Sequence, residues 1–227
     1  MDDASLLFKI SAWVIPVVLA VTLHEASHGY VALRFGDDTA LQAGRISFNP
    51  LRHIDPVGTI LIPLVLLIGS NGTIAFGYAK PVPVDFRRLR PLRLGIVAVA
   101  FAGPGSNLLL ATISAMLFNL VPLAPEWVMP WLASVLIMSI LINLILCFFN
   151  LIPIPPLDGG RIAVAVLPAN LANALARLER AGFVIILVAL FVLPLLGESL
   201  GVDLDVFRWL IAEPAQETMR WLLNVFT

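Results

Sequence analysis

Long apolar runs separated by short polar stretches dominate the sequence. Residues 6–23 are apolar apart from Lys9 and a few small hydroxyl side chains, and helical character is expected to continue to about residue 34. Residues 92–121 and 131–149 are also apolar, and residues 182–196 form a fourth long run together with their apolar flanks. A helix that crosses a membrane needs about 20 apolar residues. The pattern therefore predicts a bundle of about four transmembrane helices.

Two further patterns predict elements at the membrane surface. Residues 57–68 are apolar but too few to cross a bilayer, and they contain Pro63, so they are expected to form a short re-entrant segment. Between residues 207 and 225, apolar side chains recur at helical spacing beside charged ones, with Pro214 as a candidate break. This spacing predicts a C-terminal amphipathic helix that lies in the membrane interface.

Two connecting stretches favour strands over helices. Residues 39–48 and 73–84 are rich in β-branched and aromatic residues and are bounded by Gly, Asn and Pro. Pro81 and Pro83 lack a backbone donor, so that part is expected at an edge or in an extended loop. The predicted fold is an all-α polytopic membrane protein with a small membrane-associated β region beside the helices.

The composition agrees with a membrane protein. Hydrophobic residues make up 59% of the chain and charged residues 13%, and the mean hydropathy is +0.96, whereas soluble domains hold about 45–50% apolar and 25% charged residues. The net charge of −1 excludes the strongly basic balance of a nucleic-acid-binding protein. The single cysteine, Cys147, excludes a disulfide framework and a cysteine-based zinc module. A single membrane-embedded domain, residues 1–227, is expected.

Basic residues are distributed unevenly around the predicted crossings. If residues 57–68 do not cross, eleven of the 14 Lys and Arg residues fall on one side of the membrane, and only Lys9, Arg208 and Arg220 fall on the other. Cytoplasmic loops carry the excess of basic residues. The distribution predicts a multi-pass protein of the cytoplasmic membrane with its N-terminus outside.

The first apolar run ends in a polar cluster, His24-Glu25-Ala26-Ser27-His28. Ionisable side chains are costly inside a membrane and therefore indicate a functional site. Residues i and i+4 share one face of a helix, so His24 and His28 are expected to point the same way, with Glu25 beside them. Two imidazoles and a neighbouring carboxylate are typical of HExxH zinc hydrolases. Catalytic zinc normally takes three protein ligands and a water, so a third ligand must come from elsewhere.

Asp158 is the conspicuous candidate for the third ligand. The apolar run that ends near residue 149 leads into three prolines, which force the backbone out of helical geometry. Broken backbone at membrane depth is tolerated only where it faces protein or a water-filled cavity. Two alternatives stay open: Asp158 caps the helix that follows it, or the metal is a structural zinc, although structural sites usually have four ligands rich in cysteine.

Several motifs, taken in order, resemble the site-2 protease family of intramembrane zinc metalloproteases. They are HEASH, Gly103-Pro104-Gly105-Ser106-Asn107, Asn150-x-x-Pro153 and Leu157-Asp158-Gly159, with the Lys80-Pro81-Val82-Pro83 loop between the first two. The resemblance covers about residues 10–167, which it implies to be the catalytic core, followed by C-terminal helices at about residues 168–227. This chain departs from larger relatives because it shows no recognisable PDZ insertion and no nucleotide-sensing tail.

The resemblance implies roles for the matching residues. His24, His28 and Asp158 would hold one Zn2+ per chain, and Glu25 would be the general base. Asn150 would position substrate or stabilise the oxyanion, unless its amide only caps the broken end of its helix.

Three further residues are candidates for contact with substrate or with the metal ligands: His53, Asn107 and Lys80. The simpler expectation for His53 is a solvated or interfacial position. For Asn107 it is a bond to backbone groups or packing against the HEASH helix.

The predicted function is hydrolysis of peptide bonds within or near transmembrane segments of other proteins, single-pass ones above all, in the lipid bilayer. His24 lies roughly 27 Å along its helix from Leu6, so the site is expected toward the cytoplasmic side. An unwound substrate segment is expected to pair with a strand edge in residues 39–48 or 73–84.

Two alternatives belong to other classes: an intramembrane metal transporter and a proteolytically inactive membrane scaffold. Hydrolysis is favoured over transport because only hydrolysis needs a general base, Glu25, beside a water. A scaffold has no need of a costly polar cluster in lipid. The sequence predicts neither the oligomeric state nor the identity of the substrate.

Overall fold

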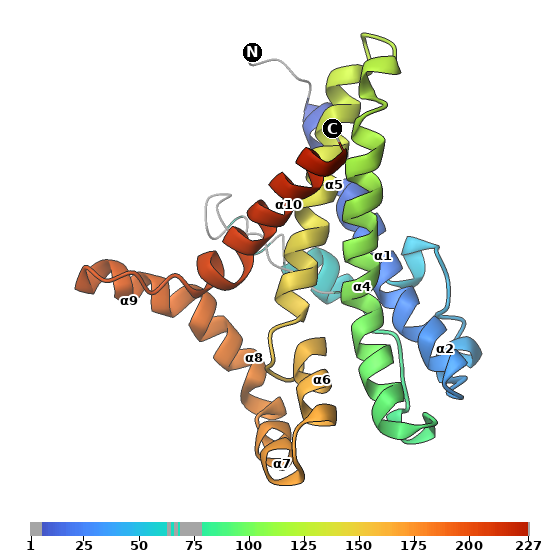
Figure 1. Ribbon diagram of the computed structural model, residues 1–227, viewed down its shortest axis with the longest axis vertical. Helices are drawn as coiled ribbons and strands as arrows, with labels where there is room; N and C mark the ends of the chain where they lie inside the picture. Colours follow the sequence, from blue (N-terminus) through green and yellow to red (C-terminus); the bar gives the residue numbers. More distant parts are fainter. Residues whose placement is uncertain (1–5, 63–64, 66–67, 69–78, 227) are drawn as a thin grey trace.

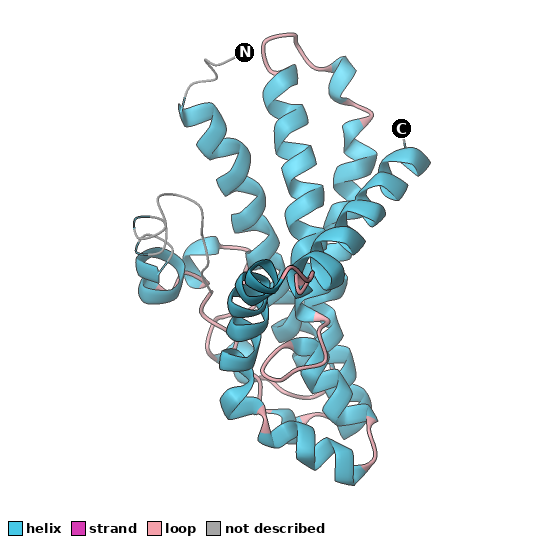
Figure 2. Ribbon diagram, turned by 90° about the vertical axis from the view of Figure 1, so that its left-hand side faces the viewer, coloured by secondary structure: helices cyan, strands magenta, loops and turns pink. Residues whose placement is uncertain are grey.

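Helices provide the regular structure of the chain in the computed structural model, which describes residues 6–62, 65, 68 and 79–226 (Figure 1). Three long helices, α1 (Leu6–Arg34), α4 (Leu92–Phe118) and α5 (Met129–Asn150), pack against one another in pairs. The described residues include no strand, and Figure 2 shows helices joined by loops. The predicted all-α class is confirmed.

Four helical stretches are long and apolar enough to cross a membrane: Ile10–Arg34, Leu92–Phe118, Met129–Asn150 and Glu179–Leu200. They coincide with the four crossings predicted from the apolar runs. At most 33% of the most apolar window in each stretch is buried inside the protein, so most of this apolar surface faces outward. Lipid is the solvent that suits such a surface.

The other helices are shorter. Between α1 and α5 lie α2 (Thr39–Gln42), 3-10 turns at Pro50–Arg52, Phe86–Arg88 and Val121–Leu123, and a π-helical stretch at Pro56–Leu61. After α5 come α6 (Asp158–Val166), α7 (Ala169–Arg177), α8 (Glu179–Leu187), a π-helical stretch at Val188–Val192, α9 (Leu193–Leu200), another at Arg208–Ala212, and α10 (Glu213–Phe226). In Figure 1, α8 and α9 lead away from the three long helices and α10 returns to them.

The predicted strand at residues 39–48 is wrong. Residues 39–42 form α2, and turns and loop follow. The Oδ1 atom of buried Asp37 accepts hydrogen bonds from the backbone N of Thr39 at 3.1 Å and from its hydroxyl at 2.5 Å. This local bonding favours a turn over a strand.

The second predicted strand is described only in part. Residues 79–84 run without regular secondary structure, as expected where Pro81 and Pro83 lack backbone donors. Residues 73–78 lie outside the described part of the chain. The predicted β region is therefore absent from residues 39–48 and 79–84, the parts of it that the structure describes.

The predicted re-entrant segment begins with a helical stretch. Asp55 precedes it, and its Oδ1 accepts hydrogen bonds from the backbone N of Val57 at 2.9 Å and of Gly58 at 2.7 Å, which is the bonding of a helix N-cap. Much of the segment beyond residue 62 lies outside the described residues. Its re-entry into the membrane stays a prediction.

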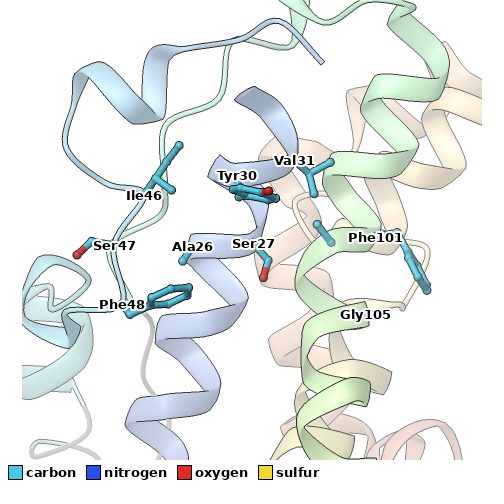
Figure 3. Close-up of a pocket in the computed structure, with 10 residues that line it drawn as sticks. Ala26, Ser27, Tyr30, Val31, Ile46, Ser47, Phe48, Phe101 and Gly105 are labelled. Atoms are coloured by element: carbon cyan, nitrogen blue, oxygen red, sulfur yellow. The ribbon is translucent and has the colours of Figure 1, made fainter. Parts of the chain in front are cut away.

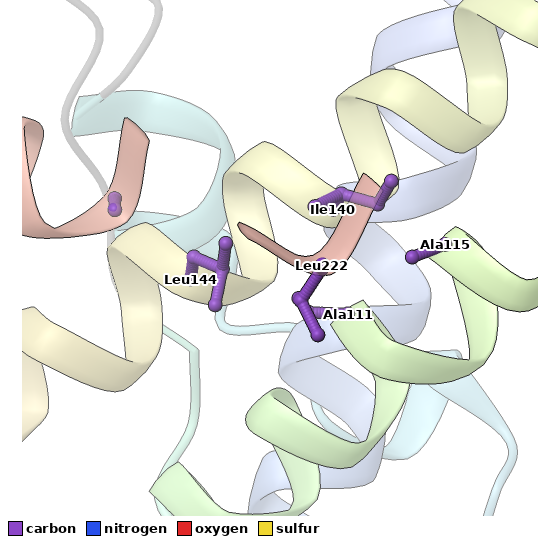
Figure 4. Packing of buried hydrophobic residues seen from close by; sticks show 6 residues of the cluster. Ala111, Ala115, Ile140, Leu144 and Leu222 are labelled. Carbon is purple, nitrogen blue, oxygen red and sulfur yellow. The ribbon is translucent and has the colours of Figure 1, made fainter. Parts of the chain in front are cut away.

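The C-terminal amphipathic helix is present as α10, and its buried face packs on the bundle. A buried apolar cluster joins α10 to α4 and α5 through Ala111, Ala115, Ile140, Leu144, Ala215 and Leu222 (Figure 4). Pro214 directly follows the π-helical stretch Arg208–Ala212 and Glu213 in a helical run that continues to Phe226, so it does not break the helix.

Candidate metal centre

Helix α1 carries both histidines of the polar cluster on one face. His24 and His28 are one turn apart, and their Nε2 atoms lie 3.1 Å from each other. His24 is buried. The helical placement predicted for HEASH is confirmed, and its two imidazoles point into the protein.

Asp158 reaches the histidines from a later part of the chain. The loop after α5 leads to α6, whose first residue is Asp158. Gly159 and Gly160 lie directly against this loop: a Cβ on Gly159 would overlap the carbonyl of Leu151, and one on Gly160 would overlap the nitrogen of Pro155. Only glycine allows so close an approach of backbone to backbone, which holds the start of α6 in place.

The three candidate ligand atoms form a nearly regular triangle. Asp158 Oδ2 lies 3.3 Å from His24 Nε2 and 3.4 Å from His28 Nε2. Tetrahedral zinc with bonds of about 2.0–2.1 Å separates neighbouring ligands by about 3.3–3.4 Å. The alternative role of Asp158 as a helix cap is wrong, because Leu157 is the N-cap residue of α6 and no side chain makes a capping bond there.

Burial and charge at Asp158 also fit a cation. Its Oδ2 is buried and, among the described residues, has no hydrogen-bond partner of good geometry. Burial raises the pKa of this carboxyl, but the imidazoles of His24 and His28, when protonated on the nitrogens that face it, outweigh burial and lower the pKa to about 2. The carboxylate is therefore ionised, as a metal ligand must be. A metal ion between the three atoms would satisfy this buried oxygen.

Helix α4 supplies an oxygen to the far side of each ring. His24 Nδ1 lies 2.6 Å from Asn107 Oδ1, and His28 Nδ1 lies 2.7 Å from the carbonyl oxygen of Val99. Because both oxygens are acceptors, each Nδ1 carries a proton, so Nε2 is the nitrogen of each ring that can give its lone pair to a metal ion. Asn107 is thus brought to a predicted ligand, and it is fully buried.

Gly103 is a site residue that sequence reasoning missed. A Cβ at this position would lie 2.5 Å from His24 Cε1 and 2.5 Å from His28 Nε2. The two rings therefore occupy the space where any other residue would place its side chain. The signal was present in the Gly-Pro-Gly string of α4, but no rule of spacing connects that string to the histidines.

Glu25 faces the extended segment that follows residue 79. Its Oε2 accepts a hydrogen bond from the backbone N of Val82 at 2.8 Å. The neighbouring Lys80 is held at both backbone groups: its N donates to the His53 carbonyl at 3.0 Å, and its carbonyl accepts from the Arg45 guanidinium at 2.6 Å. Extended backbone is therefore fixed directly beside the predicted general base.

Of the remaining candidates, His53 and Asn150 bond to backbone carbonyls and Lys80 is exposed. His53 is only 2% exposed, so the expectation of a solvated position is wrong, and its Nε2 lies 2.8 Å from the Ser47 carbonyl. The side chain of Lys80 is exposed. The Asn150 amide donates to the Leu146 carbonyl of its own helix at 3.0 Å, which is the bond of an amide at a helix end.

A cavity of about 430 Å3 opens between α1, α4 and the loop at residues 46–48 (Figure 3). Ala26 and Tyr30 of α1 line it together with Phe48 and Phe101. Ala26 follows His24 by two residues, which is about 200° around a helix. His24, His28 and Asp158 are not among the residues that line this cavity, so it is not the metal centre.

Comparisons with known proteins agree with the site. The model of peptidase family M50 matches residues 124–194, the stretch that carries Asn150 and Asp158. YwhC of Bacillus subtilis, named as a candidate zinc metalloprotease, is 43% identical over 189 residues, 80% of this chain and 80% of YwhC. Rip2 of Mycobacterium tuberculosis, named in the same way, is 31% identical over 205 residues, 88% of this chain and 71% of Rip2. No solved structure matches. With these similarities over most of its length, the chain belongs to peptidase family M50, the site-2 family of intramembrane zinc metalloproteases.

Proposed function

We propose that the chain is a zinc endopeptidase in which His24, His28 and Asp158 hold one Zn2+ and Glu25 is the general base. The observation that carries the proposal is the convergence of three ligand atoms, separated by 3.1–3.4 Å, from helices α1 and α6. Two histidines and a carboxylate are a ligand set of catalytic zinc, which keeps its fourth position for water. A structural zinc would need a fourth protein ligand, and the ligand cluster of the described residues has three members.

Zinc bound there would polarise the scissile carbonyl and lower the pKa of a bound water toward 7. The protein supplies the orientation. Asn107 and the Val99 carbonyl hold the two rings with their Nε2 atoms inward, and Gly103 leaves the rings their space.

Glu25 moves the proton. It follows His24 directly along α1, and the Val82 N–H holds one of its oxygens. The other oxygen takes a proton from the attacking water and passes it to the leaving amine, which is general acid–base catalysis by one carboxylate. Asn150 stays a candidate for contact with substrate at the end of α5.

We propose transmembrane segments of other membrane proteins, single-pass ones above all, as substrates. A transmembrane helix hides its peptide bonds in its own hydrogen-bond ladder, so the substrate must unwind before hydrolysis. The extended segment at residues 79–84, beside Glu25, offers carbonyl groups to which an unwound chain can add, because the N–H groups of Lys80 and Val82 are already bonded within the protein and Pro81 and Pro83 have none. The surplus of basic residues supports a cytoplasmic location for the end of the protein that holds residues 79–84 and α7. In Figure 1 the start of α1 lies at the opposite end from α7.

Cleavage by purified protein in detergent tests the proposal against transport. We expect wild type to cleave members of a panel of single-pass membrane segments, and Glu25→Gln to bind zinc without cleaving. A transporter would instead move zinc into liposomes in both forms and cleave nothing. Zinc flux without proteolysis would therefore replace this proposal with transport.

A further inference from the structure

A chain of buried hydrogen bonds runs from the metal centre into the interface between α4 and α5. Asn107, which meets His24 through its Oδ1, donates from its Nδ2 to the Asn143 Oδ1 at 2.8 Å. Asn143 in turn donates from its own Nδ2 to the carbonyl of Ser139 at 2.8 Å. Asn107 and Asn143 are 0% and 1% exposed, so water cannot replace these partners. No motif in the sequence singles out Asn143, which lies inside an apolar run.

The direction of this chain is fixed at its far end. A backbone carbonyl can only accept a hydrogen bond, so the Ser139 carbonyl requires the NH2 group of Asn143 on its side. The Asn143 oxygen must then face Asn107. The Asn107 NH2 group therefore faces this oxygen, and the Asn107 oxygen faces His24. The carbonyl of Ala20, 3.3 Å from the Asn107 NH2 group, favours the same orientation more weakly.

The orientation of the Asn107 amide decides which ring nitrogen of His24 is free. With an oxygen at Nδ1, His24 carries its proton on Nδ1 and offers the Nε2 lone pair. With the amide turned over, an NH2 group would face Nδ1, the proton would move to Nε2, and His24 would lose the lone pair that binds metal. His28 has no such dependence, because its Nδ1 faces the Val99 carbonyl, which cannot turn over.

We propose that Asn143 is a positioning residue of the metal centre: through Asn107 it holds His24 in the tautomer that binds zinc. The inference rests on the proposed ligand role of His24. Among the described residues Asn143 bonds to Asn107 and Ser139 and not to His24, His28 or Asp158, so it acts through the orientation of Asn107.

A simpler role for Asn143 is adhesion between helices. Polar side chains hydrogen-bond across helices in membranes and hold them together. The interface between α4 and α5 offers a matched test of that role, because the hydroxyls of Ser114 of α4 and Ser139 of α5 lie 2.7 Å apart. Ser114→Ala breaks a bond between the same two helices and leaves the chain from the Ser139 carbonyl to His24 intact. Adhesion and positioning therefore predict different results for the two positions.

The experiment measures the zinc dissociation constant of the full chain in detergent by competition with a chelator, and the absorption spectrum of the cobalt-substituted protein. Asn143→Leu should weaken zinc binding about tenfold and should change the cobalt spectrum. Tenfold is the lower end of the loss of metal affinity seen when a hydrogen-bond partner of a metal ligand is removed. Asn143→Asp should bind zinc within about threefold of wild type, because a neutral carboxyl accepts from Asn107 and donates to the Ser139 carbonyl. Ser114→Ala should bind zinc as wild type does.

Wild-type zinc affinity and an unchanged cobalt spectrum in Asn143→Leu would overturn the inference and leave the proposed function standing. An equal loss of affinity in Ser114→Ala would overturn it too, because adhesion would then explain both results. If Asn143→Leu does not fold, Asn143→Ala removes the same acceptor with a smaller side chain and carries the same expectation. Failure of wild type to bind zinc at all would overturn the proposed function together with this inference.

Discussion

An alanine at position 103 would place a methyl group against both histidine rings of the metal centre. Its Cβ would lie 2.5 Å from His24 Cε1 and from His28 Nε2, and 2.6 Å from His24 Nε2. Carbon atoms in good contact are about 3.5–4.0 Å apart, so the rings and α4 must separate by about 1 Å. Overpacking of this kind destabilises a protein by about 1–3 kcal/mol. A misplacement of about 1 Å in an active site can lower the rate about 100-fold. We expect Gly103→Ala to weaken zinc binding about 10–100-fold.

Gly105→Ala is the matched control for this substitution. It lies two residues further along α4, where a Cβ would meet the outer atoms of the half-exposed Phe101 ring at 3.2 Å, away from the histidines. Both substitutions remove a helical glycine, which favours the helix by about 1 kcal/mol, so the gain in helix propensity cancels in the comparison. Chelator competition gives the zinc affinities. Equal affinities in Gly103→Ala, Gly105→Ala and wild type would refute the placement of the two rings against α4.

Two further substitutions distinguish residues that support the metal centre from residues that only hold the helices together. Asn107→Leu should weaken zinc binding about 10–100-fold, because it removes the acceptor at His24 Nδ1; chelator competition checks this against Thr112→Val, which removes a bond to the Leu108 carbonyl within α4, and equal affinities would contradict it. Leu222→Ala should destabilise the protein by about 2–5 kcal/mol, because it empties a buried position between α10 and the bundle. Thermal melting in detergent should show this loss, and the zinc affinity should stay unchanged. Trp221 lies on the same helix and is exposed, so Trp221→Ala should melt close to wild type. Equal melting temperatures of Leu222→Ala and Trp221→Ala would contradict the packing of α10.

The candidate metal ligands could be predicted because their signals are local or forced by the membrane. The spacing of His24 and His28 decides that both lie on one face of a helix, whatever the rest of the chain does. The prolines after α5 decide that this helix ends near residue 150, a short loop before Asp158. The structure brings these separate predictions together at distances of 3.3 and 3.4 Å.

The supporting residues could not be predicted, because their roles exist only after the helices pack. Gly103 matters because α4 crosses α1 at the histidines. The bond from Val82 to Glu25 depends on the path of a loop 57 residues further along the chain. Asn143 is one polar residue in an apolar helix, and nothing near it in sequence connects it to His24.

The predicted strand at residues 39–48 failed for a different reason. Strand propensity is a weak preference that tertiary contacts override. Asp37 bonds to both the backbone and the hydroxyl of Thr39, and Ala40 is fully buried at the close approach to Gly29 of α1. These contacts require a compact turn in place of an extended strand.

The third ligand is the central claim, and the zinc content of purified Asp158→Ala tests it most directly. HEASH is intact in this variant, so any zinc that two histidines hold alone would remain. We expect one zinc per chain in wild type and in Glu25→Gln, and almost none in Asp158→Ala after dialysis against a weak chelator. A full complement of zinc in Asp158→Ala would contradict the claim that Asp158 completes the metal centre.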